Sequence, residues 1–327
     1  MSYSTASCIR WFACAASAFG LVLSTNAAQA QQKYPTKNIV LLSALTTGAP
    51  DAMQRSLAES INARTGATII VEPRSGAAGA VATLAVANAE PDGYTIGLTF
   101  SGPLIASPLI NKDIKYDPIK SFAPISLVAR GGSILVASPK LPASNFAELI
   151  KLAKTRSEPL KVGYASVANK LALLAVADAA KVKFLDIPFN TGTAMQTAVI
   201  NGDLDIIIEA PGSVYGLIQQ GRMKAIATGD KTREPLFPEV GTIGEVLPGQ
   251  GMTFWFAMVA PAGTPPDRLA WLEREVLASL QDPRIKARMY TAGINVIGGS
   301  SKMLADEIRV FQDRFGKIVK QYNITQN

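Results

Sequence analysis

Small and hydroxyl-bearing residues occupy the turns where the expected strands of this chain lead into helices. There are about five such turns, among them residues 46–51, 72–79, 101–102 and 166–169. Small side chains let backbone N–H groups approach a bound group closely, and a helix N-terminus carries partial positive charge. Turns of this kind converge at one edge of an open α/β sheet. The pattern therefore favours non-covalent binding of an anion.

Residues for nucleophilic or zinc chemistry are scarce. The chain has no histidine, and its two cysteines, Cys8 and Cys14, lie within the first 30 residues. A chain that has lost this segment cannot use a Ser–His–Asp or Cys–His mechanism, or a zinc site built on His or thiolate. No carboxylate cluster predicts an oxygen-only Mg²⁺ or Ca²⁺ site. A glycosidase-like carboxylate pair that meets only in space stays open, without a motif in its favour. We expect a protein that is not an enzyme and has no cofactor and no metal.

The first 30 residues have the pattern of a cleavable signal peptide. Arg10 precedes an apolar run, residues 11–23, that is too short to span a bilayer. Ala28-Gln29-Ala30 then gives the small-x-small pattern of a signal-peptidase site. We therefore predict cleavage after Ala30 and a periplasmic protein. An uncleaved membrane anchor is the alternative, because a single Arg makes a weak positive region.

The charge balance does not indicate a nucleic-acid-binding protein. The full chain has 32 Lys and Arg residues, and loss of Arg10 leaves 31 against 25 Asp and Glu, a net charge of +6. These basic residues are spread along the chain without a Lys/Arg run. A small positive excess still helps to attract anionic solutes.

Short apolar runs alternate with helical patterns, which indicates βα units around a mostly parallel sheet. The expected strands are residues 38–42, 68–71, 94–100, 134–137, 161–165, 205–208, 224–227 and 255–259. The clearest expected helices are residues 80–89, 145–156, 268–281 and 301–321. A second βα series begins near Ile134, and 327 residues suffice for two lobes of roughly 100–200 residues each. We predict an α/β protein with two lobes and a ligand cleft between them.

Five different short motifs occur in a fixed order along the chain. They are Tyr34-Pro35-Thr36-Lys37, Glu72-Pro73-Arg74-Ser75-Gly76-Ala77-Ala78-Gly79, Pro91-Asp92-Gly93-Tyr94-Thr95, Tyr116-Asp117-Pro118 and Ala260-Pro261-Ala262-Gly263-Thr264-Pro265. Together they resemble the periplasmic solute-binding receptors of tripartite tricarboxylate transporters, the Bug family. The resemblance covers essentially the whole chain after the signal peptide.

The resemblance implies a type II periplasmic-binding-protein fold, in which two crossover strands join two α/β lobes. The crossovers fall near residues 127–132 and 251–255, so lobe 1 comprises residues 31–130 and 253–327 and lobe 2 comprises residues 131–252. The lobes close over a small carboxylate, and the closed receptor, a monomer, docks on the membrane permease subunits of a transporter.

The resemblance also places three binding loops in lobe 1. Their candidate residues are Thr47, Gly48, Ala49 and Asp51, then Gly76, Ala77 and Gly79, then Ser101 and Gly102. Thr47 stands where the family usually has a glycine, and its hydroxyl could donate to a carboxylate or cap the helix. Asp51 fits a helix start or a water-orienting residue better than a direct contact to an anion.

In lobe 2 the candidate residues are Ser166, Ala168, Asn169, Lys170, Leu174, Asn190, Thr191, Thr193 and Glu209. Leu174 stands where the family commonly has a histidine, which indicates a more apolar wall. Lys170 is either a cation for a second carboxylate or a plain surface residue. Glu209 stands where the family often has Asp, and could accept hydrogen bonds from lobe 1 or from ligand-bound water.

The resemblance and these departures point to a receptor for a dicarboxylate, either a longer aliphatic one or an aromatic one such as terephthalate. Two alternatives stay open. One is a sensory receptor that presents its ligand to a membrane kinase. The other is a periplasmic enzyme that uses Glu209 as a general base, which would require a raised pKa.

Overall fold

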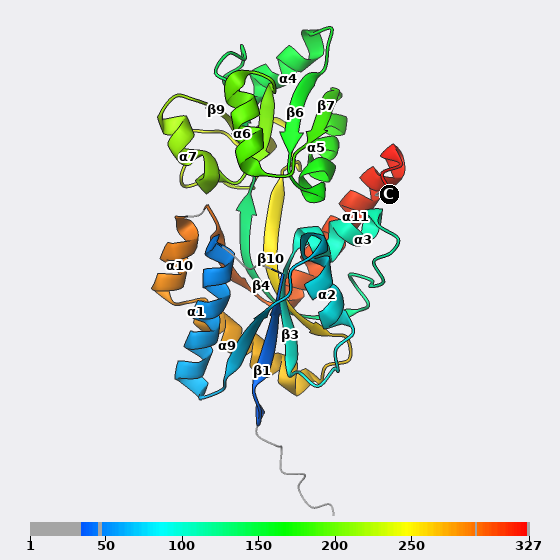
Figure 1. Ribbon diagram of the computed structural model, residues 1–327, viewed down its shortest axis with the longest axis vertical. Helices are drawn as coiled ribbons and strands as arrows, with labels where there is room; N and C mark the ends of the chain where they lie inside the picture. The colour runs from blue at the N-terminus through cyan, green and yellow to red at the C-terminus, as the bar shows by residue number, and fades with distance from the viewer. Residues whose placement is uncertain (1–33, 45–47, 292, 326–327) are drawn as a thin grey trace, which may run out of the picture. The chain divides into compact units, whose positions relative to one another are not determined.

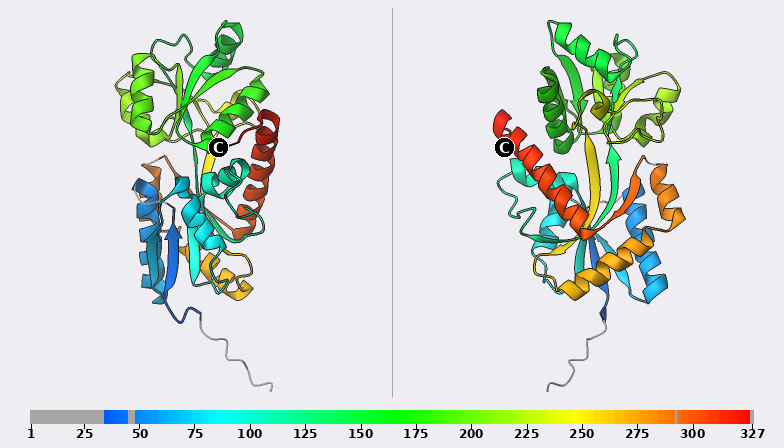
Figure 2. Two further views of the ribbon diagram at one scale, coloured as in Figure 1. Left: turned by 45° about the vertical axis from the view of Figure 1, so that its right-hand side comes forward. Right: turned by 180° about the vertical axis from the view of Figure 1, so that it is seen from behind.

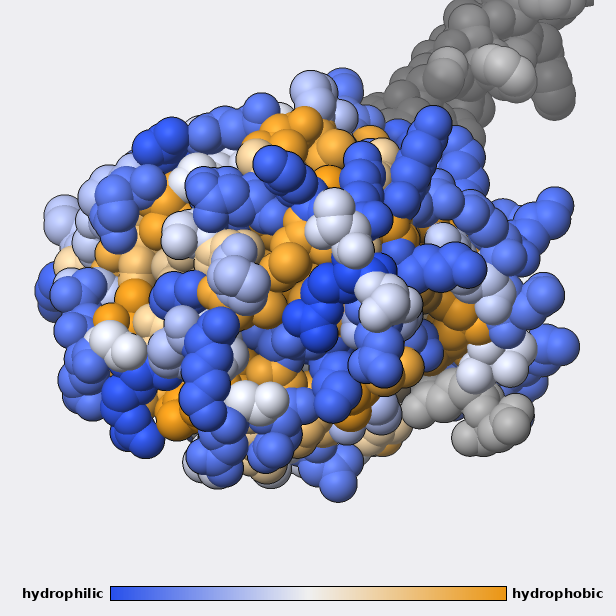
Figure 3. Space-filling model, turned by 90° about the horizontal axis from the view of Figure 1, so that it is seen from above, coloured by the Kyte–Doolittle hydropathy of each residue, from blue (hydrophilic) through white to orange (hydrophobic). Residues whose placement is uncertain are grey.

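Two mixed β-sheets organise the computed structural model, which describes residues 34–44, 48–291 and 293–325. Residues 37–327 form one unit, and the description below concerns that unit. The predicted signal peptide and Thr47 lie outside the described residues, as does the side chain of Ala49. Seen from above, the surface is mostly polar, with apolar residues in separate patches (Figure 3).

The first sheet has six strands in the order β11-β4-β10-β3-β1-β2. Their bounds are β1 (Ile39–Ser43), β2 (Ile69–Pro73), β3 (Thr95–Phe100), β4 (Phe122–Gly132), β10 (Thr253–Pro261) and β11 (Asn295–Gly299). β1 runs parallel to β2 and β3, whereas β10 runs antiparallel to β3 and β4. The expectation of a mostly parallel sheet is therefore wrong here, because the long strands that lead to and from the other sheet run against their neighbours.

The second sheet has five strands in the order β7-β6-β8-β5-β9. Their bounds are β5 (Ile134–Ala137), β6 (Leu160–Tyr164), β7 (Phe184–Pro188), β8 (Ile206–Glu209) and β9 (Lys224–Thr228). β6 is parallel to β7 and β8, and β5 is antiparallel to β8 and β9. Each sheet with its helices forms an α/β lobe, and β4 and β10 extend from the first lobe toward the second (Figure 1).

Helices cover both faces of each sheet. In the first lobe they are α1 (Gly48–Thr65), α2 (Ala80–Ala87), α3 (Ser107–Ile110), α9 (Pro266–Ser279), α10 (Pro283–Tyr290) and α11 (Ser301–Tyr322), with the short segments η1 (Ala77–Gly79) and η2 (Gly102–Ala106). In the second they are α4 (Phe146–Thr155), α5 (Val167–Ala180), α6 (Gly192–Asn201), α7 (Pro211–Gln219) and α8 (Ile243–Val246). The views agree that α1, α9 and α10 lie on one side of the first sheet and α2, α3 and α11 on the other (Figures 1 and 2). Among the described residues, no helix is both long enough and apolar enough to cross a bilayer.

The last helix packs against one of the strands that cross between the lobes. Ser300 caps α11 by accepting a hydrogen bond from the backbone of Met303. The buried residues of α11 then recur every three or four positions, which gives one apolar face. Phe311 on this face packs edge-on against the fully buried Trp255 of β10, with ring centroids 5.5 Å apart. The helix therefore holds the strand that leads back from the second sheet.

The connections between the sheets are joined by backbone hydrogen bonds. β4 ends at Gly132 and β10 begins at Thr253. Between them, the Ser133 amide donates to the Met252 carbonyl at 2.8 Å, and the Met252 amide donates to the Gly229 carbonyl at 2.9 Å. We call residues 132–133, 229 and 251–252 the crossover. The predicted lobe boundaries stay predictions.

Candidate ligand-binding cleft

A cavity of about 420 Å³ lies between the two lobes. Its described lining residues are Pro50, Ala78, Phe100, Ser101, Gly102, Ser107, Ser133, Ala165, Ser166, Val167, Ala168, Asn169, Ile208, Glu209, Ala210, Phe254 and Phe256. They come from β3 and β10 of the first sheet, from β8 of the second, and from the starts of several helices. The predicted site residues that line it are Ser101, Gly102, Ser166, Ala168, Asn169 and Glu209.

Three phenylalanines of the first lobe form an apolar wall. Phe100 and Phe256 are register partners on adjacent strands, with ring centroids 6.4 Å apart. Phe254 lies two residues along β10, so it projects from the same face, and its ring centroid is 5.7 Å from that of Phe256. We call Phe100, Phe254 and Phe256 the phenylalanine wall. It favours a ligand with an apolar body.

The start of α5 supplies the polar end of the cavity. Ser166 precedes the helix, and its side chain accepts a hydrogen bond from the Asn169 amide at 3.2 Å. Val167 and Ala168, the first two residues of the helix, line the cavity. Their amides have no carbonyl partner within an α-helix, and the helix dipole adds partial positive charge there. This helix start can therefore bind an anionic group.

Ser101 provides a second polar feature in the same cavity. The residue is only 1% exposed, and it directly follows β3. Within the part of the chain that the structure describes, its hydroxyl has no hydrogen-bond partner. Buried hydroxyl groups are nearly always hydrogen-bonded to protein or water, so this one is available to a bound molecule.

The crossover is joined directly to the start of α5. The Ser133 hydroxyl lies 3.3 Å from Asn169 Oδ1, while the Ser133 carbonyl accepts a hydrogen bond from the Gly229 amide at 2.7 Å. Both Ser133 and Asn169 line the cavity. The start of α5 is therefore hydrogen-bonded to the segments that connect the two lobes.

Glu209 is the only charged residue among the described lining residues. One of its carboxylate oxygens accepts hydrogen bonds from the Ser213 hydroxyl at 3.0 Å and from the Ala210 amide at 3.3 Å. The other lies 3.4 Å from Gln196 Nε2. A Cβ on Gly192, the first residue of α6, would come within 2.6 Å of that oxygen. The carboxylate is therefore held between the starts of α6 and α7.

Lys170 does not line the cavity in the described part of the chain. Its ammonium lies 3.1 Å from an oxygen of Asp186 on β7 and 5.9 Å from the ring centre of Tyr164. Burial acts to lower the pKa of Lys170, but the hydrogen bond and charge of Asp186, together with Tyr164, outweigh it and hold the pKa above its usual value. Its predicted role toward a second carboxylate stays a prediction.

The other predicted residues of the first lobe, apart from Thr47, are not among the described residues that line the cavity. Asp51 accepts hydrogen bonds from Arg55 at 3.0 Å and from Gln54 at 2.8 Å. Its pKa is lowered, chiefly by the hydrogen bond from Arg55. Gly48 and Ala49 begin α1. Gly76, Ala77 and Gly79 form the turn that brings Ala78 to the cavity, and Ala77 and Ala78 both have positive φ, at 44° and 51°.

In the second lobe, the Thr191 side chain caps α6 by accepting from the Ala194 amide at 3.3 Å. Asn190 and Thr193 flank that cap. Leu174 is partly buried and packs against the main hydrophobic core. None of the four is among the described residues that line the cavity.

Sequence reasoning missed the phenylalanine wall, as well as Ala78 and Ser133. A signal for part of the wall was present, because Phe254 and Phe256 alternate along a strand and so share a face. Phe100 could be added only with the register between β3 and β10. The role of Ser133 depends on three segments that meet at the crossover, which no local pattern encodes.

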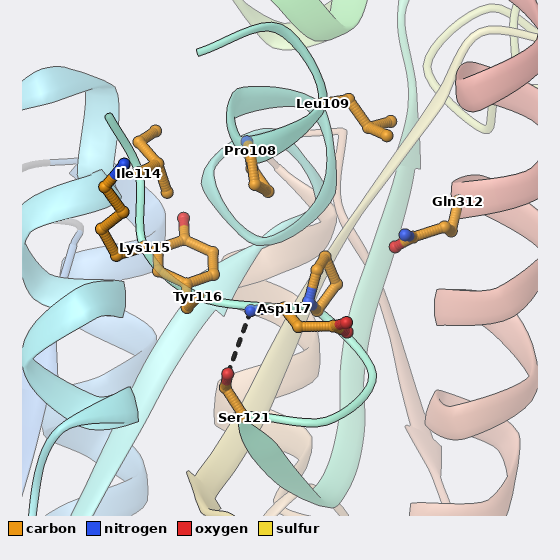
Figure 4. A pocket seen from close by; sticks show the side chains of 9 residues that line it. Pro108, Leu109, Ile114, Lys115, Tyr116, Asp117, Ser121 and Gln312 are labelled. Atoms are coloured by element: carbon orange, nitrogen blue, oxygen red, sulfur yellow. Dashed lines mark hydrogen bonds between the residues drawn. The ribbon is translucent and has the colours of Figure 1, made fainter. Parts of the chain in front are cut away.

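A second hollow of about 570 Å³ lies on the first lobe beside α11. Figure 4 shows Gln312 on one side of it and Pro108, Lys115 and Tyr116 on the other. The Asp117 amide donates to Ser121 Oγ at 3.0 Å within this loop. This hollow receives residues from one lobe only, so a ligand there would not bring the lobes together. No group of three or more His, Cys, Asp or Glu able to hold a metal occurs among the residues that the structure describes.

Comparison with known families settles the kind of protein. The family described as "Tripartite tricarboxylate transporter family receptor" matches residues 53–324. The chain belongs to this family. A relative in Bordetella bronchiseptica, named as a UPF0065 protein, is 31% identical over 305 residues, which cover 93% of this chain and 91% of the relative. The predicted membership of the Bug family is confirmed.

Two solved structures have a fold similar to that of this chain. The periplasmic binding protein BugD is 27% identical, with a TM-score of 0.71 over 90% of this chain and all of BugD. An R. palustris protein solved with adipate is 25% identical, with a TM-score of 0.73 over 89% of this chain and 99% of that protein. The predicted fold with two α/β lobes is confirmed.

Proposed function

We propose that this receptor is periplasmic and captures a small carboxylate in the cleft between its lobes. It then presents the ligand to the membrane permease subunits of a tripartite tricarboxylate-type transporter. The observation that carries the proposal is the buried Ser101 hydroxyl, which has no partner among the described residues and lines the same cavity as the start of α5. These two features, one from each lobe, provide donors for one carboxylate.

The ligand carries an apolar body of about the length of a six-carbon chain or a benzene ring, which a cavity of this size accommodates. The phenylalanine wall supports this assignment, because it offers aromatic surface and no polar side-chain atom. Adipate in the R. palustris relative supports a carboxylate with a straight apolar chain. Terephthalate, the aromatic example suggested by the sequence, also has an apolar body, because its two carboxylates are joined by a benzene ring.

Binding drives closure, because the ligand contacts both lobes at once only when the lobes are together. The crossover is the hinge, and its link from Ser133 to Asn169 joins the hinge to the ligand site. Nothing in the described residues favours the sensory or the enzymatic alternative. The receptor acts as a monomer in this account.

A thermal-shift screen of the purified protein tests the proposal, since a ligand that binds only the folded state raises its stability. The panel is hexanoate, adipate, benzoate and terephthalate, each beside its amide. We expect at least one carboxylate to raise the melting temperature and its amide to have no effect. If no carboxylate stabilises the protein, or if amides do so equally, the proposal is wrong.

A further inference from the structure

Glu209 places an uncompensated negative charge in the cleft. It forms no ion pair with any Lys or Arg among the described residues, and no Lys or Arg is among the described residues that line the cavity. The donors that do reach its carboxylate are neutral: the Ala210 amide, the Ser213 hydroxyl and the Gln196 amide group. An incoming ligand therefore meets an acceptor with a net charge.

The starts of α5, α6 and α7 in the second lobe differ in whether Glu209 lies beside them. Glu209 accepts from the Ala210 amide at the start of α7, and its other oxygen lies over Gly192 at the start of α6. The chain's own carboxylate thus already lies beside both of these helix starts. Among these three helices, only α5 has its first two residues, Val167 and Ala168, among the described residues that line the cavity, and the amides of such residues have no partner within a helix. A ligand carboxylate belongs at α5.

A second carboxylate on the ligand would meet a like charge beside Glu209, and it would meet no polar group against the phenylalanine wall. Two like charges in a partly desolvated cleft repel, and a charge against phenyl rings loses its hydration. A hydrogen-bond donor at the same place would instead gain a charge-assisted bond.

We propose that Glu209 selects the ligand group that lies beside it. The preferred class is a carboxylate with an apolar body and a second group, hydroxyl or ammonium, that donates a hydrogen bond to Glu209. A dicarboxylate such as adipate is bound less well. This inference rests on the proposed function, because it assumes that a carboxylate binds at α5.

Calorimetric titration of hexanoate, 6-hydroxyhexanoate, 6-aminohexanoate and adipate tests the inference, because these probes share one carboxylate and one chain length. With the wild-type protein we expect the donor-bearing probes to bind about tenfold or more tightly than hexanoate, and adipate to bind weakest. In Glu209→Gln, which keeps the shape but loses the charge, the advantage of 6-aminohexanoate over adipate should fall about tenfold or more. The difference in affinity between 6-hydroxyhexanoate and 6-aminohexanoate shows whether Glu209 prefers a neutral or a cationic donor.

Ser213→Ala is the matched control, because it removes a hydroxyl that lies 3.0 Å from Glu209 and 2.8 Å from the Ala210 carbonyl oxygen but keeps the Glu209 charge. It should preserve the order of the four affinities, and its melting temperature shows how much α7 depends on that hydroxyl. The inference is wrong if Glu209→Gln changes all four affinities by the same factor, which would indicate a role in closure rather than selection. It is also wrong if wild type binds adipate best. If no probe binds wild type, the proposed function itself fails.

Discussion

The ammonium of Lys170 lies 3.1 Å from a carboxylate oxygen of Asp186, and this pair joins the first turn of α5 to β7. Both side chains are less than one-third exposed, at 29% and 27%. The pair therefore contributes to the packing of the helix that presents its start to the cleft. The pair also engages the Lys170 ammonium, which is the cation that a second ligand carboxylate would need.

Lys170→Ala should lower stability without changing ligand selectivity. Loss of the pair leaves the partly buried Asp186 without its cation, which costs about 1 kcal/mol. For this size of protein that corresponds to a drop of roughly 2–4 °C in melting temperature. The ratio of hexanoate to adipate affinities, measured by calorimetry, should stay at its wild-type value. Lys151→Ala, at an exposed position on α4, is the control and should change neither quantity. A selective loss of adipate binding in Lys170→Ala would restore the second-carboxylate role.

Phe254→Ala should weaken the binding of ligands with an apolar body. Phe254 is half-buried and lines the cleft, so its loss removes apolar contact from the ligand. We expect the affinity for benzoate to fall about tenfold, because the contact is worth on the order of 1.5 kcal/mol. Phe254→Leu, which keeps an apolar side chain, should recover most of it. Unchanged benzoate affinity in Phe254→Ala would place the ligand away from the phenylalanine wall.

Gly251→Ala should disturb the crossover. A Cβ at Gly251 would lie 2.6 Å from the Gly229 carbonyl oxygen, which is itself hydrogen-bonded to the Met252 amide. Because the neighbouring atom is backbone, the segments must move apart, and we expect a loss of about 1–3 kcal/mol in unfolding free energy. Gly216→Ala on α7 meets nothing within 4 Å and should be neutral or stabilising by up to about 1 kcal/mol. Equal effects of the two substitutions in urea unfolding would contradict the tight packing of the crossover.

Glu234 should make stability depend on pH in a defined direction. It is 3% exposed, its Oε2 has no partner among the described atoms, and burial followed by the charge of Asp230 raises its pKa. Because the folded-state pKa is raised, the stability that the neutral Glu234 carboxyl contributes is fully present below the unfolded pKa of about 4.3. This stability is lost as the pH rises through the folded-state pKa. Glu234→Gln should therefore be more stable than wild type at pH 7 by about 1 kcal/mol.

The pH series provides the check for Glu234. The difference in melting temperature between Glu234→Gln and wild type should shrink as the pH is lowered from about 7 toward about 4.5, because the wild-type carboxyl then becomes neutral. A difference that does not change with pH would show that the substitution acts through packing and not through charge.

Local patterns were enough to predict most elements and the polar turns. Expected strands 134–137 and 224–227 and expected helix 301–321 agree with β5, β9 and α11 to within one residue at each end. The direction of β4 and β10 was not predictable, because alternation along a strand is the same for parallel and antiparallel neighbours. The partner of Lys170 was missed for a similar reason, since Asp186 lies on another element and meets it only through the pairing of β6 with β7.

The candidate site was predictable where a residue acts through its own turn and not where it depends on tertiary placement. Ser101 and Ser166 each follow a strand closely, so their position at the sheet edge follows from the order of elements. Thr191 also follows a strand closely and caps α6 as Ser166 caps α5, yet only Ser166 is among the described residues that line the cavity. A sequence cannot distinguish these outcomes, because the same residue types serve as caps and as ligand donors.

Carboxylate binding at the start of α5 can be measured by calorimetric titration of the wild-type protein with benzoate and hexanoate, beside benzamide and hexanamide. Each amide has the body of its acid but lacks the negative charge that the start of α5 would bind. We expect saturable binding of one carboxylate per chain and no measurable binding of the matching amide. Equal affinities for acid and amide, or an absence of binding by either acid, would contradict this expectation.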